Sequence, residues 1–457
     1  MKKSILGIFL IIITLVTVGA ICSNSGKVPT KFSLIYWSPE HTEDNISSAI
    51  TGFETMYPYV DVQYKKYNYD EYEDMLINSW AKGQGPDIFS LPNTDTKKYY
   101  DLIAPLPAAV SVTTVETKST FGKKETIVNT VSQKCMSVAE LKNQFIDAVA
   151  SDAVFTHKGA KESTAKEKIF GIPLATDTLV LFYNKDLLNQ AGITTAATNW
   201  QEVVDHTKLL TKIDKENNII QSGVALGTAN NISAYFDILS VLMMQYGAQM
   251  SDDNNRITFD QGLEDEERVP SQQALDFYTK FAMPDWETYT WNSQQNSALE
   301  AFASGKLGYY LGYHYNLEQI KKMAPNLNFD LTTLPQINAG NKINYPSYWL
   351  ESVSINSTHQ DMAWAFVQYL TSKENSEKYL ISAHKPAARR DLIAGQGDDY
   401  ELAIFSEQAL TAKSWYHGKD SAEAKNLFAA MIDQAVANTL PIADIISSTA
   451  RKIELTM

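Results

Sequence analysis

The chain has 457 residues, which is more than one hydrophobic core usually holds, and its 44% hydrophobic and 20% charged residues are typical of a globular protein. These values predict more than one domain and exclude a disordered chain. The formal net charge of −14, with no stripe of Lys and Arg, argues against binding to nucleic acid.

The N-terminus combines two lysines with the apolar run 5–22, which predicts an export signal or a membrane anchor. The run is longer than the apolar part of most cleaved signals and barely long enough to span a bilayer. Residues 18–20 would suit cleavage, whereas Cys22 resembles the acylated cysteine of bacterial lipoproteins, although Ile21 replaces the usual small residue before it. Both outcomes stay open. We expect a chain that is attached to the outer face of the cytoplasmic membrane through its N-terminus, or is periplasmic.

After a linker at 23–30, strand-like and helix-like patterns alternate. Strands are predicted at 32–37, 60–64 and 87–91, and apolar residues at helical spacing predict helices at 46–57 and 72–80. This β-α-β-α-β order indicates a parallel, doubly wound sheet. Residues 111–168 are rich in Thr, Ser and Lys and lack a sustained period, so we interpret them as a solvated insertion.

In the second half of the chain, strand-like and helix-like patterns alternate again. A strand is predicted at 179–183, the spacing of Asn199 and Glu202 indicates a helix start, and a tyrosine-rich strand is expected at 307–315. A helix is expected from residue 361, and the tail to residue 457 reads as mostly helical. The one cysteine besides Cys22 is Cys135, so we expect no internal disulfide framework.

The segment 169–188, IFGIPLATDTLVLFYNKDLL, resembles the part of maltose-binding-type solute-binding proteins of ABC importers that crosses between two lobes. Its Tyr183-Asn184-Lys185-Asp186 run is the most specific element. Shorter matches follow the family's order along the chain, at Tyr57-Pro58, Gly85-Pro86-Asp87-Ile88, Ala191-Gly192-Ile193, Asn199-Trp200, Gly305-Lys306, Leu334-Pro335, Ala363-Trp364-Ala365-Phe366 and 386–390. Together they extend from about residue 31 to residue 392.

The resemblance implies an α/β, two-lobed periplasmic-binding-protein-like fold of type II, with two doubly wound sheets joined by crossing strands. On this template the chain would cross near 173–177 and again near Leu334-Pro335. The first lobe would hold 31–173 and 336–372, and the second would hold 178–333 and 373–457. The implied function is a receptor that closes over a small solute and works as a monomer with an importer permease. The 24 Tyr and 8 Trp favour a sugar as that solute.

A sugar has apolar C–H faces and a belt of hydroxyls, so aromatic rings and carboxylates suit it. Trp37 ends the first strand, where ligands of open parallel sheets bind, and the alternative is a core tryptophan. By resemblance, Asp177 matches the acidic residue that contacts sugar, although it is also placed to cap a backbone amide. Tyr315 falls where the family has a stacking tryptophan, but here the motif is Tyr313-His314-Tyr315.

The C-terminal part of the region that resembles the family gives three further predicted ligand-binding residues and one residue that would assist them. Tyr348 and Trp349 replace a glycine-rich turn of the family, so we expect their rings in the cleft, with Glu351 as a partner, or else packed between the lobes. Arg389 lies in an element that resembles the family's Pro-x-Arg, and it would donate to a solute hydroxyl or form a structural salt bridge.

Signals for catalysis are absent from the sequence. The seven histidines are scattered, no HExxH, GxxxxGK[ST] or GxSxG motif occurs, and Cys135 has no recognisable partner, so we expect no enzyme activity, no metal site and no cofactor. Two alternatives stay open: a receptor for a peptide, polyamine or anion, and an enzyme of the same fold that acts on a small organic substrate.

Overall fold

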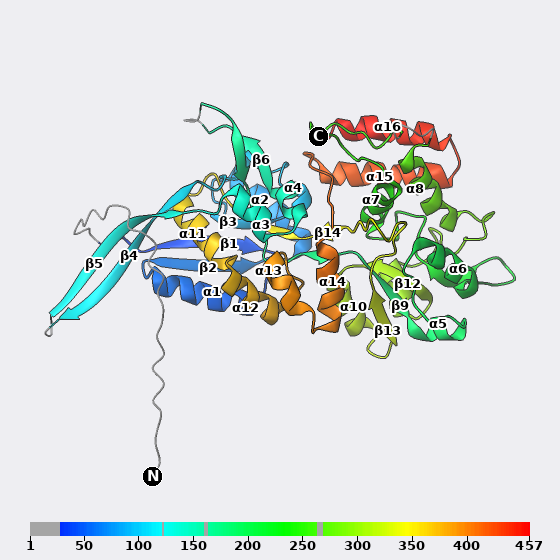
Figure 1. Cartoon of the computed structure of the whole chain (residues 1–457), viewed down its shortest axis with the longest axis horizontal. Helices are drawn as coiled ribbons and strands as arrows, with labels where there is room; N and C mark the ends of the chain where they lie inside the picture. The colour runs from blue at the N-terminus through cyan, green and yellow to red at the C-terminus, as the bar shows by residue number, and fades with distance from the viewer. Residues whose placement is uncertain (1–27, 121–122, 160–162, 263–267) are drawn as a thin grey trace, which may run out of the picture.

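The chain forms two hydrophobic cores that lie side by side (Figure 1). The structure, a computed structural model, describes residues 28–120, 123–159, 163–262 and 268–457. The predicted signal or anchor at 5–22, with Cys22, lies outside the described residues. Within the described ranges, no helix combines the length and the apolar character that crossing a membrane requires.

The first core is built around a four-stranded sheet with the order β15-β3-β1-β2. Its elements are β1 (Phe32–Ser38), α1 (Glu43–Met56), β2 (Val60–Lys66), α2 (Tyr69–Ala81), β3 (Ile88–Pro92) and β15 (Trp349–Val353). β1 pairs in parallel with both β2 and β3, and β15 adds to β3 in the antiparallel direction. The predicted β-α-β-α-β unit is confirmed, because buried residues recur at helical spacing in α1 and α2 and the parallel strands need such crossovers.

The predicted insertion at 111–168 is only partly a surface feature. Strands β4 (Ala109–Thr120) and β5 (Lys123–Lys134) form a long hairpin that projects from the first core (Figure 1). The next elements are α3 (Val138–Gln144), α4 (Asp147–Ala153), β6 (Val154–His157) and β7 (Lys166–Ile169). Leu141, Phe145 and Val149 are fully buried and belong to the first core, so this part of the insertion contributes to packing.

The second core surrounds a five-stranded sheet with the order β10-β11-β12-β9-β13. Its strands are β9 (Val180–Asn184), β10 (Lys212–Ile213), β11 (Ile219–Val224), β12 (Leu307–Gly312) and β13 (Phe329–Thr332). Only β11 and β12 are parallel, and β9 is antiparallel to both of its neighbours. The sheet is therefore mixed. The helices of the same core are α5 (Lys185–Gln190), α6 (Trp200–Leu210), α7 (Tyr235–Tyr246), α8 (Pro270–Thr279), α9 (Ala298–Ala303), α10 (His314–Met323), α15 (Ser421–Val436) and α16 (Ile442–Glu454), of which α15 packs against α7 and α8, and α16 packs against α8.

The chain crosses between the cores three times, near 174–179, near 345–348 and after residue 393. Strand β8 (Asp177–Thr178) pairs with β14 (Pro346–Ser347), Ala175 bridges to Ala387, and Asn344 bridges to Ala412. The second crossing is thus at 346–347 and not at Leu334-Pro335, because Leu334 is buried in the second core.

The boundary near the C-terminus also differs from the expected one. Helices α12 (Lys373–Ala383) and α13 (Arg390–Ile393) follow α11 (Gln360–Leu370) onto the first core, where Tyr379 and Leu392 are buried. The expectation assigned 373–393 to the second core. The apolar residues of these helices pack instead against the first sheet's helix layer, and α14 (Tyr400–Ala409) then returns the chain to the second core.

Candidate functional site

Asp177 is the first residue of β8, so it lies at a crossing between the cores. Its Oδ1 accepts the backbone N–H groups of Thr178 at 2.8 Å and of His314 at 2.9 Å, and its Oδ2 accepts that of Tyr315 at 3.3 Å. The last two donors open α10, where a carboxylate stabilises the positive end of the helix. The alternative of amide capping is therefore what the structure shows. Contact of Asp177 with a solute stays a prediction.

Burial raises the pKa of Asp177 from its ordinary 3.8 to about 7, although three N–H donors and Lys385 favour the charged form. Because the pKa of Asp177 is higher in the folded than in the unfolded chain, folding favours the protonated side chain. The resulting contribution to the free energy of unfolding is complete below about pH 4 and is lost as the pH rises to about 7. We expect the free energy of unfolding of the wild type to fall over this range relative to Asp177→Asn, whose amide does not titrate. Urea unfolding at pH 4 to 8 checks this, and parallel curves for both proteins would contradict it.

Tyr315 lies in the first turn of α10 and not in the predicted strand, because β12 ends at Gly312. The side chain of Asn316 begins the helix by accepting the N–H of Tyr313 at 2.9 Å. The Tyr315 side chain is 52% exposed, and its ring stacks on that of Tyr313 with 5.6 Å between centroids and 18° between planes. It leaves an aromatic surface accessible, which is what a sugar-stacking residue needs.

The hydroxyl of Tyr315 is in electrostatic range of both cores. Although about half of Tyr315 is exposed, partial burial raises the pKa of its hydroxyl above the ordinary 10.0, and Tyr310, Asp177, Asp237 and Tyr69 raise it further. Tyr310 belongs to β12 of the second core, whereas Tyr69 belongs to α2 of the first. The backbone N–H of Tyr315 also donates to Asp177 of the crossing strand β8, so Tyr315 lies at the junction of the cores, and its contact with a solute stays a prediction.

A row of aromatic rings in the first core contains two predicted residues, Trp37 and Trp349. Ring centroids are 4.8 Å apart from Trp37 to Tyr67, 6.0 Å from Tyr67 to Tyr72 and 6.1 Å from Tyr72 to Trp349. Trp349 also meets Tyr69 edge to face at 5.9 Å. Tyr69 is exposed and both tryptophans are partly exposed, so the row reaches the surface. The structure thus brings Trp37 and Trp349 into one cluster, and their contact with a solute stays a prediction.

Tyr348 differs from its neighbour Trp349 because successive strand residues face opposite ways. Its ring is buried in the first core, so it lacks the exposed face expected for stacking. Its hydroxyl donates to Asp152.

Asp152 ties the two cores together. Its Oδ2 accepts the Nδ2–H of Asn93 at 2.8 Å and the Tyr348 hydroxyl, both from the first core. Its Oδ1 accepts the Ser414 hydroxyl and lies 2.9 Å from Nε2 of His417, and both of these precede α15 of the second core. Asp152 is fully buried, and its two oxygens are occupied by these donors.

Glu351 is placed differently from the prediction, since it is fully buried inside the first core. Its Oε2 accepts the hydroxyls of Tyr36 and Ser90, each at 2.7 Å, and its Oε1 lies 2.8 Å from Nε2 of His41. A buried carboxylate needs such partners, because an unpaired one is costly. Glu351 therefore supports the sheet beneath the aromatic row and does not line a surface.

Arg389 is also buried within the first core, where it precedes α13. Its Nε and Nη2 donate to the carboxylate of Asp391, its Nη1 donates to the carbonyl of Thr371, and its guanidinium lies 5.1 Å from the ring centroid of Phe145. Arg389 thus forms a structural salt bridge, the expected alternative to a solute contact, but the pair lies within the first core and does not clamp the two lobes.

Sequence reasoning missed Tyr69 and Asp237. Tyr69 is the exposed first residue of α2, on the helix face that also carries the buried Tyr72 and Leu76, a spacing that can be read from the sequence. Asp237, in the first turn of α7, accepts the hydroxyl of Tyr313 at 2.7 Å. No local pattern connects two residues that are 76 positions apart.

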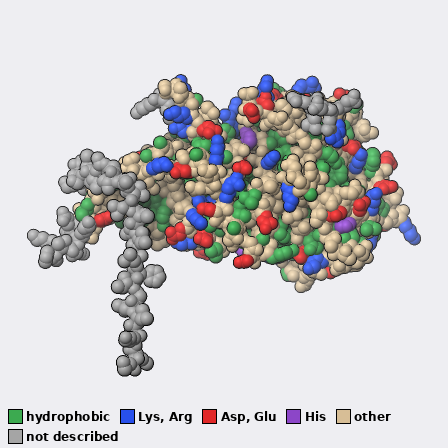
Figure 2. Space-filling view, in the orientation of Figure 1, with side chains coloured by type: hydrophobic (Ala, Val, Ile, Leu, Met, Phe, Trp, Pro, Cys, Tyr) green, Lys and Arg blue, Asp and Glu red, His purple; other side chains and the backbone are tan. Residues whose placement is uncertain are grey.

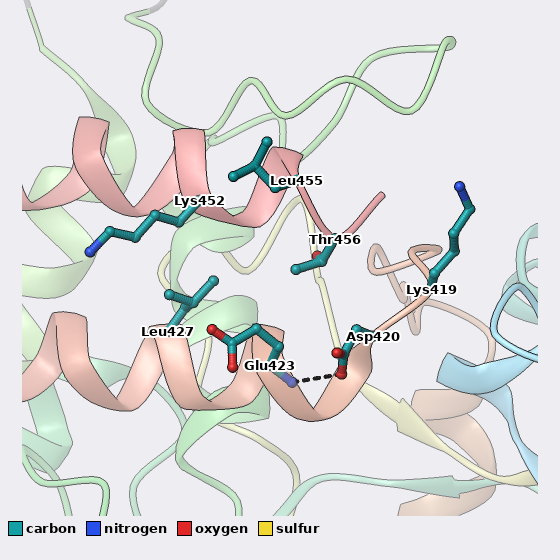
Figure 3. A pocket seen from close by; sticks show the side chains of 7 residues that line it. All are labelled: Lys419, Asp420, Glu423, Leu427, Lys452, Leu455 and Thr456. Atoms are coloured by element: carbon teal, nitrogen blue, oxygen red, sulfur yellow. Dashed lines mark hydrogen bonds between the residues drawn. The ribbon is translucent and has the colours of Figure 1, made fainter.

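Two surface pockets lie away from these residues. One, of about 400 Å³, lies between α15 and α16, where charged side chains surround Leu427 and Leu455 (Figure 3). The other, of about 410 Å³, lies at the base of the β4–β5 hairpin and includes Phe32, Tyr59 and His359. Neither is lined by a predicted site residue.

The charges of the described surface are mixed. On the face in Figure 2, Lys and Arg side chains are interspersed with Asp and Glu and form no basic stripe. Among the described residues, no group of three or more His, Cys, Asp or Glu is arranged to hold a metal ion.

Comparison with solved structures shows the fold. A cyclic α-maltosyl-1,6-maltose binding protein from Arthrobacter globiformis is similar over 93% of this chain and 99% of its own, with a TM-score of 0.71 and 14% identity. A maltose-binding periplasmic protein from Listeria monocytogenes, in complex with maltose, is similar over 92% and 97%, with a TM-score of 0.68 and 17% identity. The fold is therefore that of type II periplasmic solute-binding proteins, as predicted.

Sequence comparison gives the family. A galactooligosaccharide-binding protein of Bacillus subtilis is 23% identical over 80% of this chain and 76% of its own length. A binding protein of Brucella abortus is 24% identical over 58% of this chain, and the match spans only 60% of that relative. The sequence profile of one family matches residues 48–401. The chain therefore belongs to the bacterial extracellular solute-binding proteins.

Proposed function

We propose that this chain is an exported receptor that binds a mono- or oligosaccharide at the junction of its two cores and delivers it to the permease of an ABC importer. The observation that carries the proposal is the exposed ring of Tyr315 on a helix whose first turn is held by Asp177 at a crossing strand. A sugar can stack on such a ring while its hydroxyls meet nearby polar groups. The aromatic row ending in Trp349 and Tyr69 supports a contact from the first core.

The two cores then act as lobes, one formed by 31–173 and 348–393 and the other mainly by 178–345 and 400–457. Solute bound between them favours the closed arrangement, which the permease recognises. The similarity to a galactooligosaccharide-binding protein and to maltose-binding structures supports a sugar as the solute. On this proposal the protein acts as a monomer without catalysis, metal or cofactor, and its N-terminus attaches it to the membrane.

The proposal is tested with four probes: maltose, maltotetraose, a galactooligosaccharide and tagatose. We expect at least one to raise the melting temperature of the purified protein and to bind with one-to-one stoichiometry in calorimetry, because a ligand of the folded state stabilises it. The same incubations are analysed by chromatography for products. Turnover would favour the same-fold enzyme, and stabilisation by spermidine or a peptide alone would favour a non-sugar receptor.

Tyr315→Ala is expected to weaken binding of the tightest of these sugars by about ten-fold to a hundred-fold, since truncating a central aromatic contact removes roughly 1.4 to 3 kcal/mol. Tyr400→Ala, which truncates an exposed tyrosine on α14, is the matched control and should leave the Kd unchanged. Titration calorimetry measures both. Equal affinities for the wild type and Tyr315→Ala would remove Tyr315 from the site.

A further inference from the structure

The ring on which Tyr315 is stacked, that of Tyr313, forms a polar pair with the partly buried Asp237. Tyr313 is 2% exposed, and its hydroxyl donates to Oδ2 of Asp237 at 2.7 Å. Asp237 lies in the first turn of α7, so two helices of the second core, α7 and α10, meet at this hydrogen bond. A buried tyrosine hydroxyl needs a partner, and Asp237 supplies it.

The ring of Tyr315 is held from two sides. Its backbone N–H donates to Asp177 at 3.3 Å, which fixes the start of the side chain. Its ring is stacked on Tyr313, which fixes the direction in which the side chain points. The orientation of Tyr313 depends in turn on Asp237, because without that acceptor its buried hydroxyl would be unpaired.

We propose that Asp237 is a positioning residue for sugar binding: through the hydroxyl of Tyr313 it holds the ring on which Tyr315 is stacked, and so sets the affinity without touching the sugar. This rests on the proposed function, in which Tyr315 carries the solute. A fixed ring binds more tightly than a mobile one, because the cost of ordering the side chain is met before the solute arrives.

The proposal separates two roles of the carboxylate, its charge and its ability to accept a hydrogen bond. Asp237→Asn keeps an oxygen acceptor for Tyr313 but removes the charge. Asp237→Leu removes both, and Tyr313→Phe keeps the stacked ring while it removes the donor. Asp433→Leu makes the same change at an exposed carboxylate of α15 and serves as the matched control.

The experiment measures the Kd of the tightest sugar among maltose, maltotetraose, a galactooligosaccharide and tagatose by calorimetry. We expect Asp237→Leu to weaken binding about ten-fold, Tyr313→Phe by about five-fold, and Asp237→Asn and Asp433→Leu by less than about two-fold. The deciding arm repeats Asp237→Leu and Tyr313→Phe in the Tyr315→Ala background. There each should change the Kd by less than about two-fold, because no ring remains to be positioned.

Each outcome has a separate meaning. If Asp237→Asn weakens binding as much as Asp237→Leu, the charge of Asp237 acts directly and the positioning role is wrong. Effects that simply add to that of Tyr315→Ala would also overturn it, since they would reflect general damage to the core. If Asp237→Leu does not fold, the paired Tyr313→Phe measurements decide alone. If the wild type binds none of the sugars, the proposed function fails, and the positioning role fails with it.

Discussion

Replacing Asp152 by alanine is expected to lower the free energy of unfolding by about 3 to 5 kcal/mol, the cost of breaking a buried charged network. Asp152 is 1% exposed and accepts or contacts donors from Asn93, Tyr348, Ser414 and His417. Alanine would leave all four donors without this acceptor, and those of Asn93 and Tyr348 are buried away from water. Because two donors come from each core, the attachment of the segment before α15 should loosen as well.

Urea unfolding followed by circular dichroism and tryptophan fluorescence measures the effect. Asp147→Ala is the matched control on the same helix, because the Asp147 side chain is 83% exposed and its ion pair with Arg390 is a surface pair. The control should cost less than about 1 kcal/mol. Asp152→Asn should fall between the two, since an amide accepts at one end only. A loss in Asp152→Ala no larger than in the control would contradict the role assigned to this carboxylate.

Glu351→Ala is expected to produce a loss of similar size, about 3 to 5 kcal/mol, because three partners inside the first core lose their acceptor. The hydroxyls of Tyr36 and Ser90 and Nε2 of His41 all meet its oxygens within 2.8 Å. The ring of His41 in turn meets the hydroxyl of Tyr379 at 2.8 Å, so the network connects β1, β3, β15 and α12.

The measurement is the same unfolding experiment, with Glu377→Ala as the control at an exposed position of α12. Glu351→Gln should recover part of the loss, because the amide oxygen still accepts one bond. Sugar affinity should also fall in Glu351→Ala, since Trp349 lies two residues earlier on the same strand. An unchanged unfolding midpoint would show that the network is dispensable.

The elements that could be predicted are those whose signal is local. The alternation at 60–64 and the helical spacing at 46–57 and 72–80 reflect which side chains face the core, and the structure places β2, α1 and α2 there. The strand predicted at 307–315 was too long. Its tyrosines are typical of strands, but Asn316 caps the next turn and ends the strand at Gly312.

The candidate site was predictable only where the family resemblance or strand order located a residue. The carboxylate of Asp177 accepts the backbone N–H groups of His314 and Tyr315, which lie 137 and 138 positions away in the sequence. Glu351 was misplaced because a carboxylate beside aromatic residues resembles a sugar contact, whereas its partner Tyr36 is 315 positions away. Asp152 had a weak signal: it continues the buried face of Ala148 and Val149, where an acidic residue requires a partner.

The division of the chain between the two cores also depends on contacts between residues that are distant in the sequence. Helix α12 looks like any amphipathic surface helix, and its sequence does not say which sheet its apolar face will cover. Its buried residue Tyr379 reaches His41 of the first core across 338 positions, a pairing that only the folded chain reveals.

The three crossing segments restrict how the cores can move. A backbone hydrogen bond from Leu179 to Tyr345 joins the first two segments, and bonds from Thr176 to Pro386 and from Lys413 to Asn344 tie them to the chain before and after the third. Sliding one core along the other, or twisting it about the long axis, would have to break these bonds. Bending about a line across the segments needs only small changes in their φ and ψ angles. The strand pairing therefore opposes sliding and twisting more than bending, and the bonds from Asp152 to Ser414 and His417 are what a bend of one core toward the other would have to change.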